Sequence, residues 1–548
     1  MNHRKYSVIS MMVLAALLSA CGTGQAPSLT AQKRESVVVF VEPPMARVAM
    51  MAAPMHKAMA YSRQHVPEMR PPVQNTEQYG KIDTNPVQAV AQQPVSTFSI
   101  DVDTGSYSNT RRFLNNGRLP PVEAVRLEEL INYFDYAYPQ PKGNQPFAVH
   151  TETVDSPWQA NAKIIKVGIQ AKDLAVSQLP PANLVFLVDV SGSMTAENKL
   201  PLVKQTLRLL TEQLRPQDKV ALITYASGEK LVLPPTSGKE KDTILRAINE
   251  LQAGGATAGE SAIQLAYKEA EKAFIKNGIN RILLATDGDF NVGITDFDTL
   301  KGMVAEKRQT GVSLTTLGFG TGNYNEHLME QLADAGDGNY SYIDNKNEAK
   351  KVLQRQLSST LATVAQDVKI QVEFNPATVK EYRLIGYENR MLKQEDFNND
   401  KVDAGDIGAG HNVTALYEII PVGKQGWLDE SRYQSAPITQ AGSKNEYAFV
   451  KLRYKKPNQS ESILISQAIP VGSKPWSEAD KQTRFALAVA AYGQQLRGGQ
   501  YNGKMGWDNI IQLAQSSAQP DPYGLREEFI ELAKIAKSLS AKQPESGN

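Results

Sequence analysis

The sequence predicts an α/β fold for its central part: a doubly wound, mostly parallel sheet, flanked by β-rich and helical modules. Short continuous apolar runs, such as 184–188 and 281–286, are typical of buried parallel strands. Each run ends in a carboxylate and a glycine turn before a helical pattern begins. Because strands and helices alternate in this way, we expect helices on both faces of the sheet.

The expected elements follow one another along residues 181–363. A helix at 199–210 follows the first strand, and strands at 219–225 and 229–233 are separated by Ser227 and Gly228, which suit a hairpin. The remaining expected helices are 239–251, 261–276, 297–309, 325–335 and 347–361, and the remaining expected strands are 281–286, 313–319 and 338–343.

Polar oxygens gather where the first of these strands ends. Asp189, Ser191 and Ser193 share one tight turn with Gly192. The carboxyl ends of strands are where open α/β sheets place their ligands. Carboxylate and hydroxyl oxygens on one turn suit a small hard cation.

Two further segments complete a recognisable pattern. A glycine pair at 254–255 precedes Thr257, and the strand at 281–286 runs into Asp287 and Gly288. Together with the Asp189 turn, this arrangement resembles the von Willebrand factor type A domain and its metal-ion-dependent adhesion site. Carried over residue by residue, the site falls on Asp189, Ser191, Ser193, Thr257 and Asp287.

The resemblance implies a chemistry for these residues. The serines and the threonine would contact Mg²⁺, or Mn²⁺ or Ca²⁺ in its place, and the aspartates would act largely through water. Since the direct ligands are neutral, the cation stays electrophilic and can accept a carboxylate from a partner protein. We therefore expect a binding protein and not an enzyme. The alternatives are a metal-dependent envelope hydrolase and a structural lipoprotein whose metal only stabilises the fold.

The amino terminus predicts an envelope location. Residues 1–20 have the features of a signal peptide, with Arg4 and Lys5 preceding an apolar stretch at 8–19 that is short for a membrane span. The following site resembles the lipobox of bacterial lipoproteins, which implies cleavage before Cys21 and acylation of that residue. Because Gly22 and not an aspartate follows the cysteine, we expect a lipid anchor in the outer membrane.

The amino-acid composition limits which other functions the chain could have. The chain has 548 residues, 41% hydrophobic and 21% charged, which is enough for several cores. Lys and Arg number 59 against 58 Asp and Glu, so no basic excess indicates nucleic acid. Cys21 is the only cysteine, which excludes an intramolecular disulfide. The partner expected from the metal chemistry is an envelope protein that presents a carboxylate.

Outside the central domain, four further regions are expected. Residues 21–94 read as a flexible tether, 95–180 as an amino-terminal module of helices and then strands, 364–470 as a β-rich domain and 471–548 as a helical region. Pieces of the stretch 101–138 resemble the amino-terminal module of bacterial envelope lipoproteins with a von Willebrand factor type A domain. We hypothesise that the strands at 147–171 and those after residue 364 form one β-sandwich, with the α/β domain inserted into it.

Three other patterns allow more than one interpretation. Asp101 and Asp103 suggest a phosphohydrolase, but Gly105 breaks that pattern, so we interpret them as turn or cap residues. The methionines of the tether near His56 and His65 could hold Cu(I), although a linker that uses methionine as an apolar residue explains them as well. The loop at 395–406, which ends at Asp406, resembles a calcium loop, with oxygen ligands at Asp396, Asn398 and Asp400. It departs from the EF-hand pattern at Lys401 and Ile407, and a solvated turn is the alternative.

Overall fold

The computed structural model describes residues 76–256, 259–288, 297–355, 359, 361–429, 444–457, 459–517, 521 and 523–542. The predicted signal peptide, Cys21, the methionine-rich part of the tether and Thr257 lie outside the described residues. No helix in the described part of the chain is long and apolar enough to cross a membrane.

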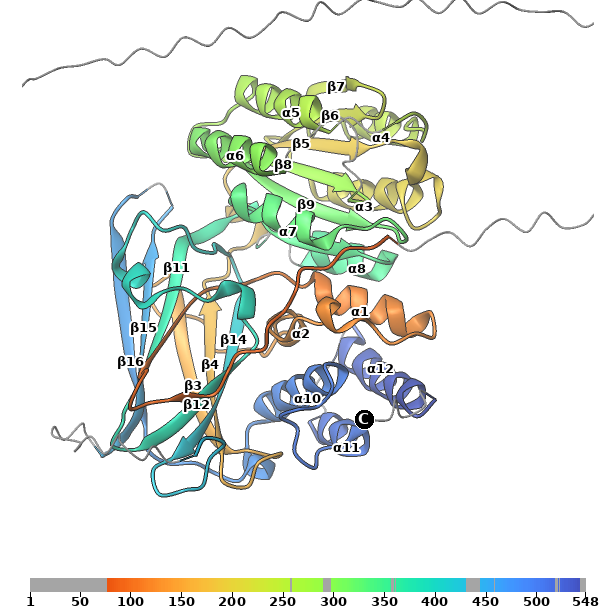
Figure 1. Cartoon of the computed structure of the whole chain (residues 1–548). Helices are drawn as coiled ribbons and strands as arrows, with labels where there is room; N and C mark the ends of the chain where they lie inside the picture. Colours follow the sequence, from red (N-terminus) through yellow and green to blue (C-terminus); the bar gives the residue numbers. More distant parts are fainter. Residues whose placement is uncertain are drawn as a thin grey trace, which may run out of the picture. The chain divides into compact units, whose positions relative to one another are not determined.

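The central domain is an α/β fold built on a six-stranded sheet (Figure 1). Its strand order is β10-β9-β8-β5-β6-β7, and every neighbouring pair is parallel except β6 and β7, which form the expected hairpin. The strands are β5 (Ala182–Asp189), β6 (Lys219–Tyr225), β7 (Glu229–Ser237), β8 (Ile279–Thr286), β9 (Ser313–Phe319) and β10 (Tyr340–Ile343). The predicted fold class is therefore confirmed.

Helices cover both faces of this sheet, because successive side chains of each strand point to opposite sides. Leu184, Phe186 and Val188 of β5 pack with the helices of one face, and Val185 and Leu187 pack with those of the other. The first face carries α3 (Leu200–Gln213), α4 (Lys241–Asn249) and α8 (Lys346–Lys350), which a helical turn at Lys351–Arg355 continues. The second face carries α5 (Glu260–Lys272), α6 (Phe297–Lys307) and α7 (Glu326–Ala335).

A β-sandwich is formed by strands that precede and follow the α/β domain. One sheet has the order β1-β12-β14-β4-β3, and in the other β2 and β13 pair with β11, which β15 and β16 extend. Its strands are β1 (Gln88–Ala89), β2 (Val95–Ser99), β3 (Phe147–Asp155), β4 (Lys163–Ala171), β11 (Thr363–Phe374), β12 (Val379–Ile385), β13 (Ile407–Gly408), β14 (Asn412–Pro421), β15 (Glu446–Lys455) and β16 (Ser462–Pro470). Because β4 pairs with β14 and the two sheets share one apolar core, the hypothesis of an inserted α/β domain is confirmed. The amino-terminal module and the β-rich domain thus both contribute strands to one β-sandwich.

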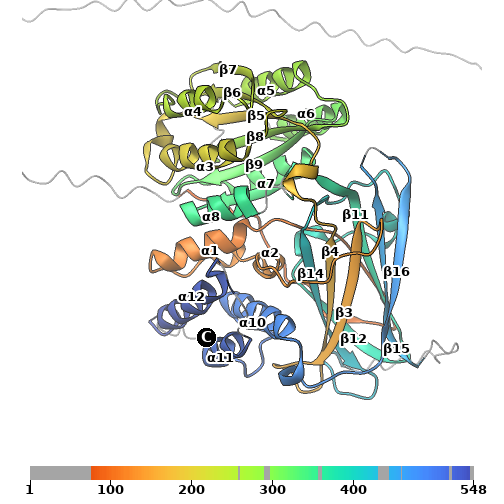
Figure 2. The ribbon, with the colours of Figure 1, turned by 180° about the vertical axis from the view of Figure 1, so that it is seen from behind.

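A third core joins the two ends of the described chain (Figure 2). Helices of the amino-terminal module, α1 (Gly105–Asn115) and α2 (Leu127–Asn132), lie beside three carboxyl-terminal helices. These are α10 (Lys481–Leu496), α11 (Trp507–Ser516) and α12 (Leu525–Ser540). Phe134 meets Phe485 and Phe529 edge to face, with ring centroids 4.9 and 5.8 Å apart.

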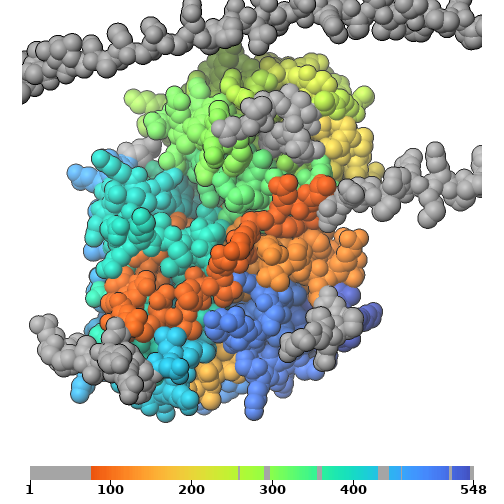
Figure 3. All heavy atoms as spheres, viewed as in Figure 1, coloured from red at the N-terminus to blue at the C-terminus, as the bar shows by residue number. Residues whose placement is uncertain are grey.

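The folded chain begins earlier than predicted. Residues 76–94, assigned to the tether by composition, include β1 and a short segment, 76–79, bound to the α/β domain. In that segment the amide of Thr76 donates to the carbonyl of Gly322 at 2.8 Å, and the amide of Gln78 donates to the carbonyl of Tyr324 at 2.9 Å. Figure 3 shows this part of the chain lying across the surface of the α/β domain and the sandwich. The polar composition misled the prediction because backbone hydrogen bonds and a buried ion pair of Glu77 with Arg112, at 2.8 Å, help to hold the segment.

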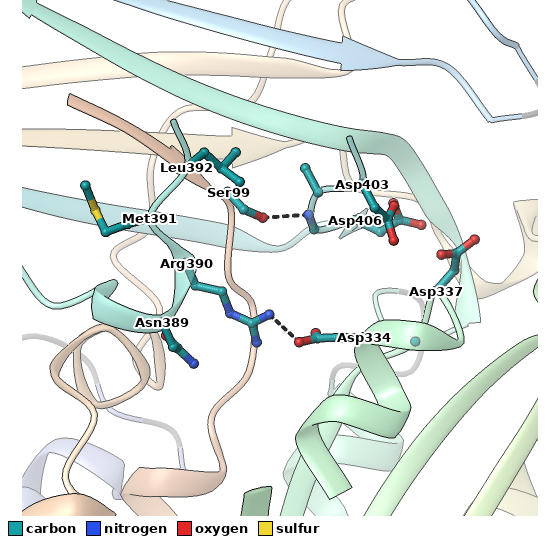
Figure 4. Close-up of a pocket in the computed structure, with 12 residues that line it drawn as sticks. Ser99, Asp334, Asp337, Asn389, Arg390, Met391, Leu392, Asp403 and Asp406 are labelled. Atoms are coloured by element: carbon teal, nitrogen blue, oxygen red, sulfur yellow. Dashed lines mark hydrogen bonds and ion pairs between the residues drawn. The ribbon is translucent and has the colours of Figure 1, made fainter. Parts of the chain in front are cut away.

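Buried arginines join the α/β domain to its neighbours at helix α7. Arg126, just before α2, contacts Glu330 of α7 at 2.8 Å. Arg390, which follows β12, contacts Glu330 at 3.2 Å and Asp334 at 2.6 Å. Figure 4 shows the contact with Asp334. We call this region the α7 interface; its charged members are Arg126, Arg390, Asp101, Asp103, Glu129, Glu326, Glu330 and Asp334.

Asp101 and Asp103 belong to this interface. The Asp101 carboxylate accepts the amide of Asp103 at 2.9 Å, which is the predicted turn role. Asp103 does more than was expected, because it accepts the amide of Tyr340 in the α/β domain and pairs with Arg390 at 3.0 Å.

Candidate metal site

Asp189 is the last residue of β5 and lies buried at the carboxyl edge of the sheet. One of its carboxylate oxygens accepts the amide of Ser191 at 2.8 Å, and the other accepts the hydroxyl of Thr286 at 2.9 Å. Burial raises the pKa of Asp189 to about 6, with a further upward contribution from the charge of Asp287, while the Ser191 amide lowers it. The carboxylate is thus fixed in place by the ends of two neighbouring strands.

The two serines lie on the turn that follows β5. The hydroxyl oxygens of Ser191 and Ser193 are 3.0 Å apart and hydrogen-bonded to each other. Ser191 is buried, and Ser193 lies in a short helical turn at Gly192–Thr195. The structure therefore brings together three of the predicted site residues, since Asp189 fixes the amide of Ser191.

The loop that leads to Thr257 is held against the same turn. The amide of Gly254 donates to the carbonyl of Val190 at 2.7 Å, and the amide of Gly192 donates to the carbonyl of Gly255 at 2.9 Å. Gly255 has a φ of +89°, and a Cβ there would lie 2.6 Å from the hydroxyl of Ser227, so a glycine is required. Thr257 itself lies outside the described residues, but the described loop approaches the turn two residues before it.

Asp287 comes directly after β8 and is fully buried. Its carboxylate accepts a hydrogen bond from Nζ of Lys199 at 2.7 Å and from the amide group of Asn323 at 3.2 Å. The next residue, Gly288, has a φ of +82°, and a Cβ there would lie 2.7 Å from the Asn325 amide. The strand thus ends in a glycine turn against the loop at 320–325.

Three residues of the site were not among the predicted ligands: Thr286, Lys199 and Asn323. Thr286 was within the recognised pattern, so its position could be predicted although its bond to Asp189 could not. Lys199 and Asn323 lie on the segments that follow β5 and β9, and their contact with Asp287 depends on how those strands are ordered. No local signal in the sequence marks either residue.

The oxygen ligands available at this edge of the sheet fit a hard divalent cation. Two hydroxyls lie beside the carboxylate of Asp189 after β5, and the carboxylate of Asp287 after β8 is close enough for its charge to act on Asp189. Oxygen ligands of this kind suit Mg²⁺. Among the described residues, no group of three or more His, Cys, Asp and Glu side chains is arranged to hold a metal. A site at this edge therefore depends on the hydroxyls, with Ser191, Ser193 and Thr257 as the residues that would hold the ion.

The calcium hypothesis for the loop at 395–406 gains no support from the structure. The carboxylate of Asp400 accepts the hydroxyl of Ser462 at 2.7 Å and lies 3.4 Å from the guanidinium of Arg453. The side-chain oxygen of Asn398 also faces Arg453, at 3.5 Å. Two of the expected ligands are thus directed at a guanidinium.

A pocket of about 200 Å³ lies between α7 and the sandwich (Figure 4). Its polar lining comes from Arg390 and the aspartates Asp334, Asp337, Asp403 and Asp406. Burial raises the pKa of Asp403 to about 6, although Arg308 lowers it. The pocket is acidic, but it has no paired hydroxyls like those at the sheet edge.

Comparison with known families agrees with this geometry. Residues 183–356 match the family described as the von Willebrand factor type A domain, and residues 73–166 match one described as von Willebrand factor. Residues 359–539 match the family described as "Uncharacterized protein YfbK, C-terminal". The central domain is therefore a von Willebrand factor type A domain, an adhesion-type domain, which supports protein binding as its general role.

Relatives extend this result to most of the chain. The protein YfbK of Escherichia coli (strain K12) is 49% identical over 477 residues, which cover 85% of this chain and 82% of that protein. The protein sll0103 of Synechocystis is 25% identical over 325 residues, covering 58% of this chain and 72% of the other. The chain belongs to the YfbK family of bacterial proteins with a von Willebrand factor type A domain.

Solved structures include more distant proteins with the same kind of domain. The von Willebrand factor type A protein from Catenulispora acidiphila has a TM-score of 0.40 and 15% identity, covering 73% of this chain and 91% of its own. The ArnB paralog VWA2 from Sulfolobus acidocaldarius has a TM-score of 0.34 and 16% identity, covering 72% of this chain and 98% of its own.

Proposed function

We propose that this protein is a lipid-anchored envelope protein whose α/β domain binds a divalent cation and uses it to capture an acidic side chain of a partner protein. The observation that carries the proposal is the pair of hydroxyls of Ser191 and Ser193, 3.0 Å apart beside the buried Asp189. Neutral hydroxyl ligands leave most of the charge of a bound cation unneutralised. A carboxylate from outside is then a favourable additional ligand, because hard cations prefer oxygen donors.

The hydroxyl contacts favour binding over hydrolysis. A serine nucleophile needs a base within hydrogen-bond reach. Here the hydrogen bond between the side chains of Ser191 and Ser193 joins two hydroxyls, and the carboxylate of Asp189 accepts from a backbone amide and from Thr286. These contacts support a cation-binding role for the oxygens at this turn.

A partner pull-down tests the proposed capture. Wild-type protein and Thr257→Ala are each mixed with envelope extract, once with Mg²⁺ and once with EDTA. We expect a partner to be retained only by the wild type with Mg²⁺, because the variant lacks a metal-binding hydroxyl and EDTA removes the metal. A partner retained equally in all four samples would show that the metal site is not the docking surface.

Two controls make the result specific. Thr236→Ala changes a half-buried threonine of β7 whose hydroxyl bonds locally, to the carbonyl of Pro234, so it should bind like the wild type. On the partner, changing the captured Asp to Asn or Glu to Gln keeps the shape and removes the anionic ligand. This change should also abolish retention.

The lipid anchor is tested separately. Cys21→Ser removes the sulfur that would be acylated, so the variant should move from the detergent phase to the aqueous phase in phase partitioning. A variant that stays with the membrane fraction like the wild type would contradict the anchor. Fractionation of inner and outer membranes from wild-type cells then tests the expected outer-membrane location.

A further inference from the structure

Lys199 is a buried cation at the candidate metal site. It is 6% exposed, and its Nζ donates to the carboxylate of Asp287 at 2.7 Å and to the side-chain oxygen of Asn323 at 2.9 Å. None of the resemblances described above assigns a role to this residue. Its position is informative because it places a positive charge on one of the two carboxylates expected to attract the metal.

The lysine side chain is held along its length. Gly320 follows β9 with a φ of +80°, and a Cβ there would lie 2.4 Å from Cε of Lys199. The aliphatic stem therefore packs directly on the backbone of this glycine, and the ammonium group ends between Asp287 and Asn323. This fixed path distinguishes Lys199 from a surface lysine that pairs with whatever carboxylate is near.

Stability alone does not explain a buried pair of this kind. Removing two charges from water is costly, and a buried ion pair often contributes no more to stability than apolar residues of similar size. A buried lysine changes the electrostatic potential around it, since nearby charges interact strongly where water is excluded. The relevant quantity is the net charge of the site.

Counting the charges shows what Lys199 changes. Asp189 and Asp287 bring two negative charges and Lys199 one positive charge, so the site carries one net negative charge before a metal binds. A divalent cation then leaves one net positive charge. Without Lys199, the loaded site would be neutral and would attract a carboxylate less.

We propose that Lys199 is a built-in counter-ion that makes the metal-loaded site selective for anions. This inference rests on the proposed function and deepens it. Lys199 weakens the affinity for the metal, because the two cations repel each other, and it strengthens the capture of a carboxylate. It acts by its charge on the site and is a specificity-determining residue, not a metal ligand.

Opposite effects of one variant test the proposal. In full-length protein, Lys199→Met keeps an unbranched stem on Gly320 and removes the charge, and Lys199→Arg keeps the charge. The affinity for Mn²⁺ is measured by electron paramagnetic resonance. Acetate is then titrated onto the Mn²⁺-loaded proteins at constant ionic strength, and displacement of metal-bound water is followed by water-proton relaxation.

We expect Lys199→Met to bind Mn²⁺ about 10-fold more tightly and acetate about 10-fold more weakly, each equivalent to about 1.4 kcal/mol. Lys199→Arg should stay near the wild type in both measurements. Lys204→Met, which removes a half-buried lysine of α3 whose Nζ donates to the carbonyl of Asn249, is the matched control and should change neither. A second variant, Asn323→Asp, adds a negative charge beside Lys199 and should shift both affinities in the same directions as Lys199→Met. If Lys199→Met fails to fold, Asn323→Asp still tests whether charge at this position controls the two affinities.

The outcomes separate this inference from the proposed function. Wild-type protein that binds no Mn²⁺, or that shows no response to acetate, would overturn both. Mn²⁺ and acetate affinities that are unchanged or that fall together in Lys199→Met and Asn323→Asp would overturn the counter-ion role alone. In that case the metal-dependent capture would stand.

Discussion

The carboxyl edge of the α/β sheet and the α7 interface both concentrate carboxylates, but they surround them with different groups. At the sheet edge, Asp189 and Asp287 lie with serine and threonine hydroxyls and one lysine. At the α7 interface, six carboxylates lie around Arg126 and Arg390, each of which contacts several of them. The two regions are close in sequence, because the loop at 320–325 bears Asn323 and leads directly into α7.

The difference shows that acidity alone does not make a metal site. Guanidinium groups already neutralise part of the α7 interface, and burial raises the pKa of Glu326 to about 8, with Arg126 opposing and Glu330 adding to that shift. The arginines and the raised pKa of Glu326 therefore reduce the net negative charge of the α7 interface. At the sheet edge the hydroxyls supply oxygens without adding charge, which leaves room for a cation and for an anion after it.

The largest expected effect is loss of an arginine at the α7 interface. Arg390→Ala leaves buried carboxylates of the amino-terminal module and the α/β domain without their shared partner. Breaking a buried ion pair on one side typically costs about 3–5 kcal/mol, so the urea midpoint should fall markedly. Lys81→Ala breaks an exposed pair, with 81% and 82% of the two side chains exposed, and should leave the urea midpoint close to that of the wild type. Equal midpoints for the two variants would contradict the role of Arg390.

The next effect concerns the metal and separates the two regions directly. Asp189→Ala should lower the affinity for Mg²⁺ about 10–100-fold, as the loss of an orienting carboxylate does at other metal sites. Asp334→Asn removes a charge from the α7 interface and should leave Mg²⁺ affinity unchanged. Titration calorimetry on both variants is the measurement. Equal Mg²⁺ affinity in Asp189→Ala and the wild type would rule out the site.

The last expected effect, the smallest over any one pH unit, is a pH dependence of stability. Glu326 has both carboxylate oxygens buried without a hydrogen bond, and its nearest cation is Arg126, 3.9 Å away. Other charges that face it from the packed elements are Glu330, Glu128 and Arg112. Its pKa is raised from 4.5 to about 8 in the folded protein. Its contribution to stability is thus fully present below pH 4.5 and is lost as the pH rises through about 8, by at most about 1.4 kcal/mol per pH unit.

Glu326→Gln checks this dependence because glutamine stays neutral at every pH. The difference in unfolding free energy between variant and wild type should move in favour of the variant between pH 5 and pH 9. Glu373→Gln, on an exposed pair with Lys451, is the control and should show no such trend. Parallel stability curves for Glu326→Gln and wild type would contradict the raised pKa.

Local patterns predicted much of the fold. The strands at 219–225 and 313–319 have the predicted bounds, because each is rich in apolar and β-branched residues and ends at a turn. Asp189, Ser191 and Ser193 could be predicted as neighbours because one turn carries all three. The long-range contacts could not be predicted. The two-residue strand β1 has no periodicity, and Arg390 meets Asp103 because the segments that follow β12 and β2 come together in the folded sandwich.

The insertion of the α/β domain also sets an order of folding. Strand β4 ends at Ala171 with eight of its nine residues buried, yet the strand that covers its edge, β14, begins only at Asn412. Pairing across so long a stretch of chain is slow, whereas the α/β domain between them has its contacts within one continuous segment and can fold first. A folded insert would bring its two ends, and hence β4 and β11, into the same neighbourhood. Until β14 arrives, the β3–β4 hairpin presents an open apolar edge, so a chain truncated before residue 412 should aggregate even though its α/β domain is complete.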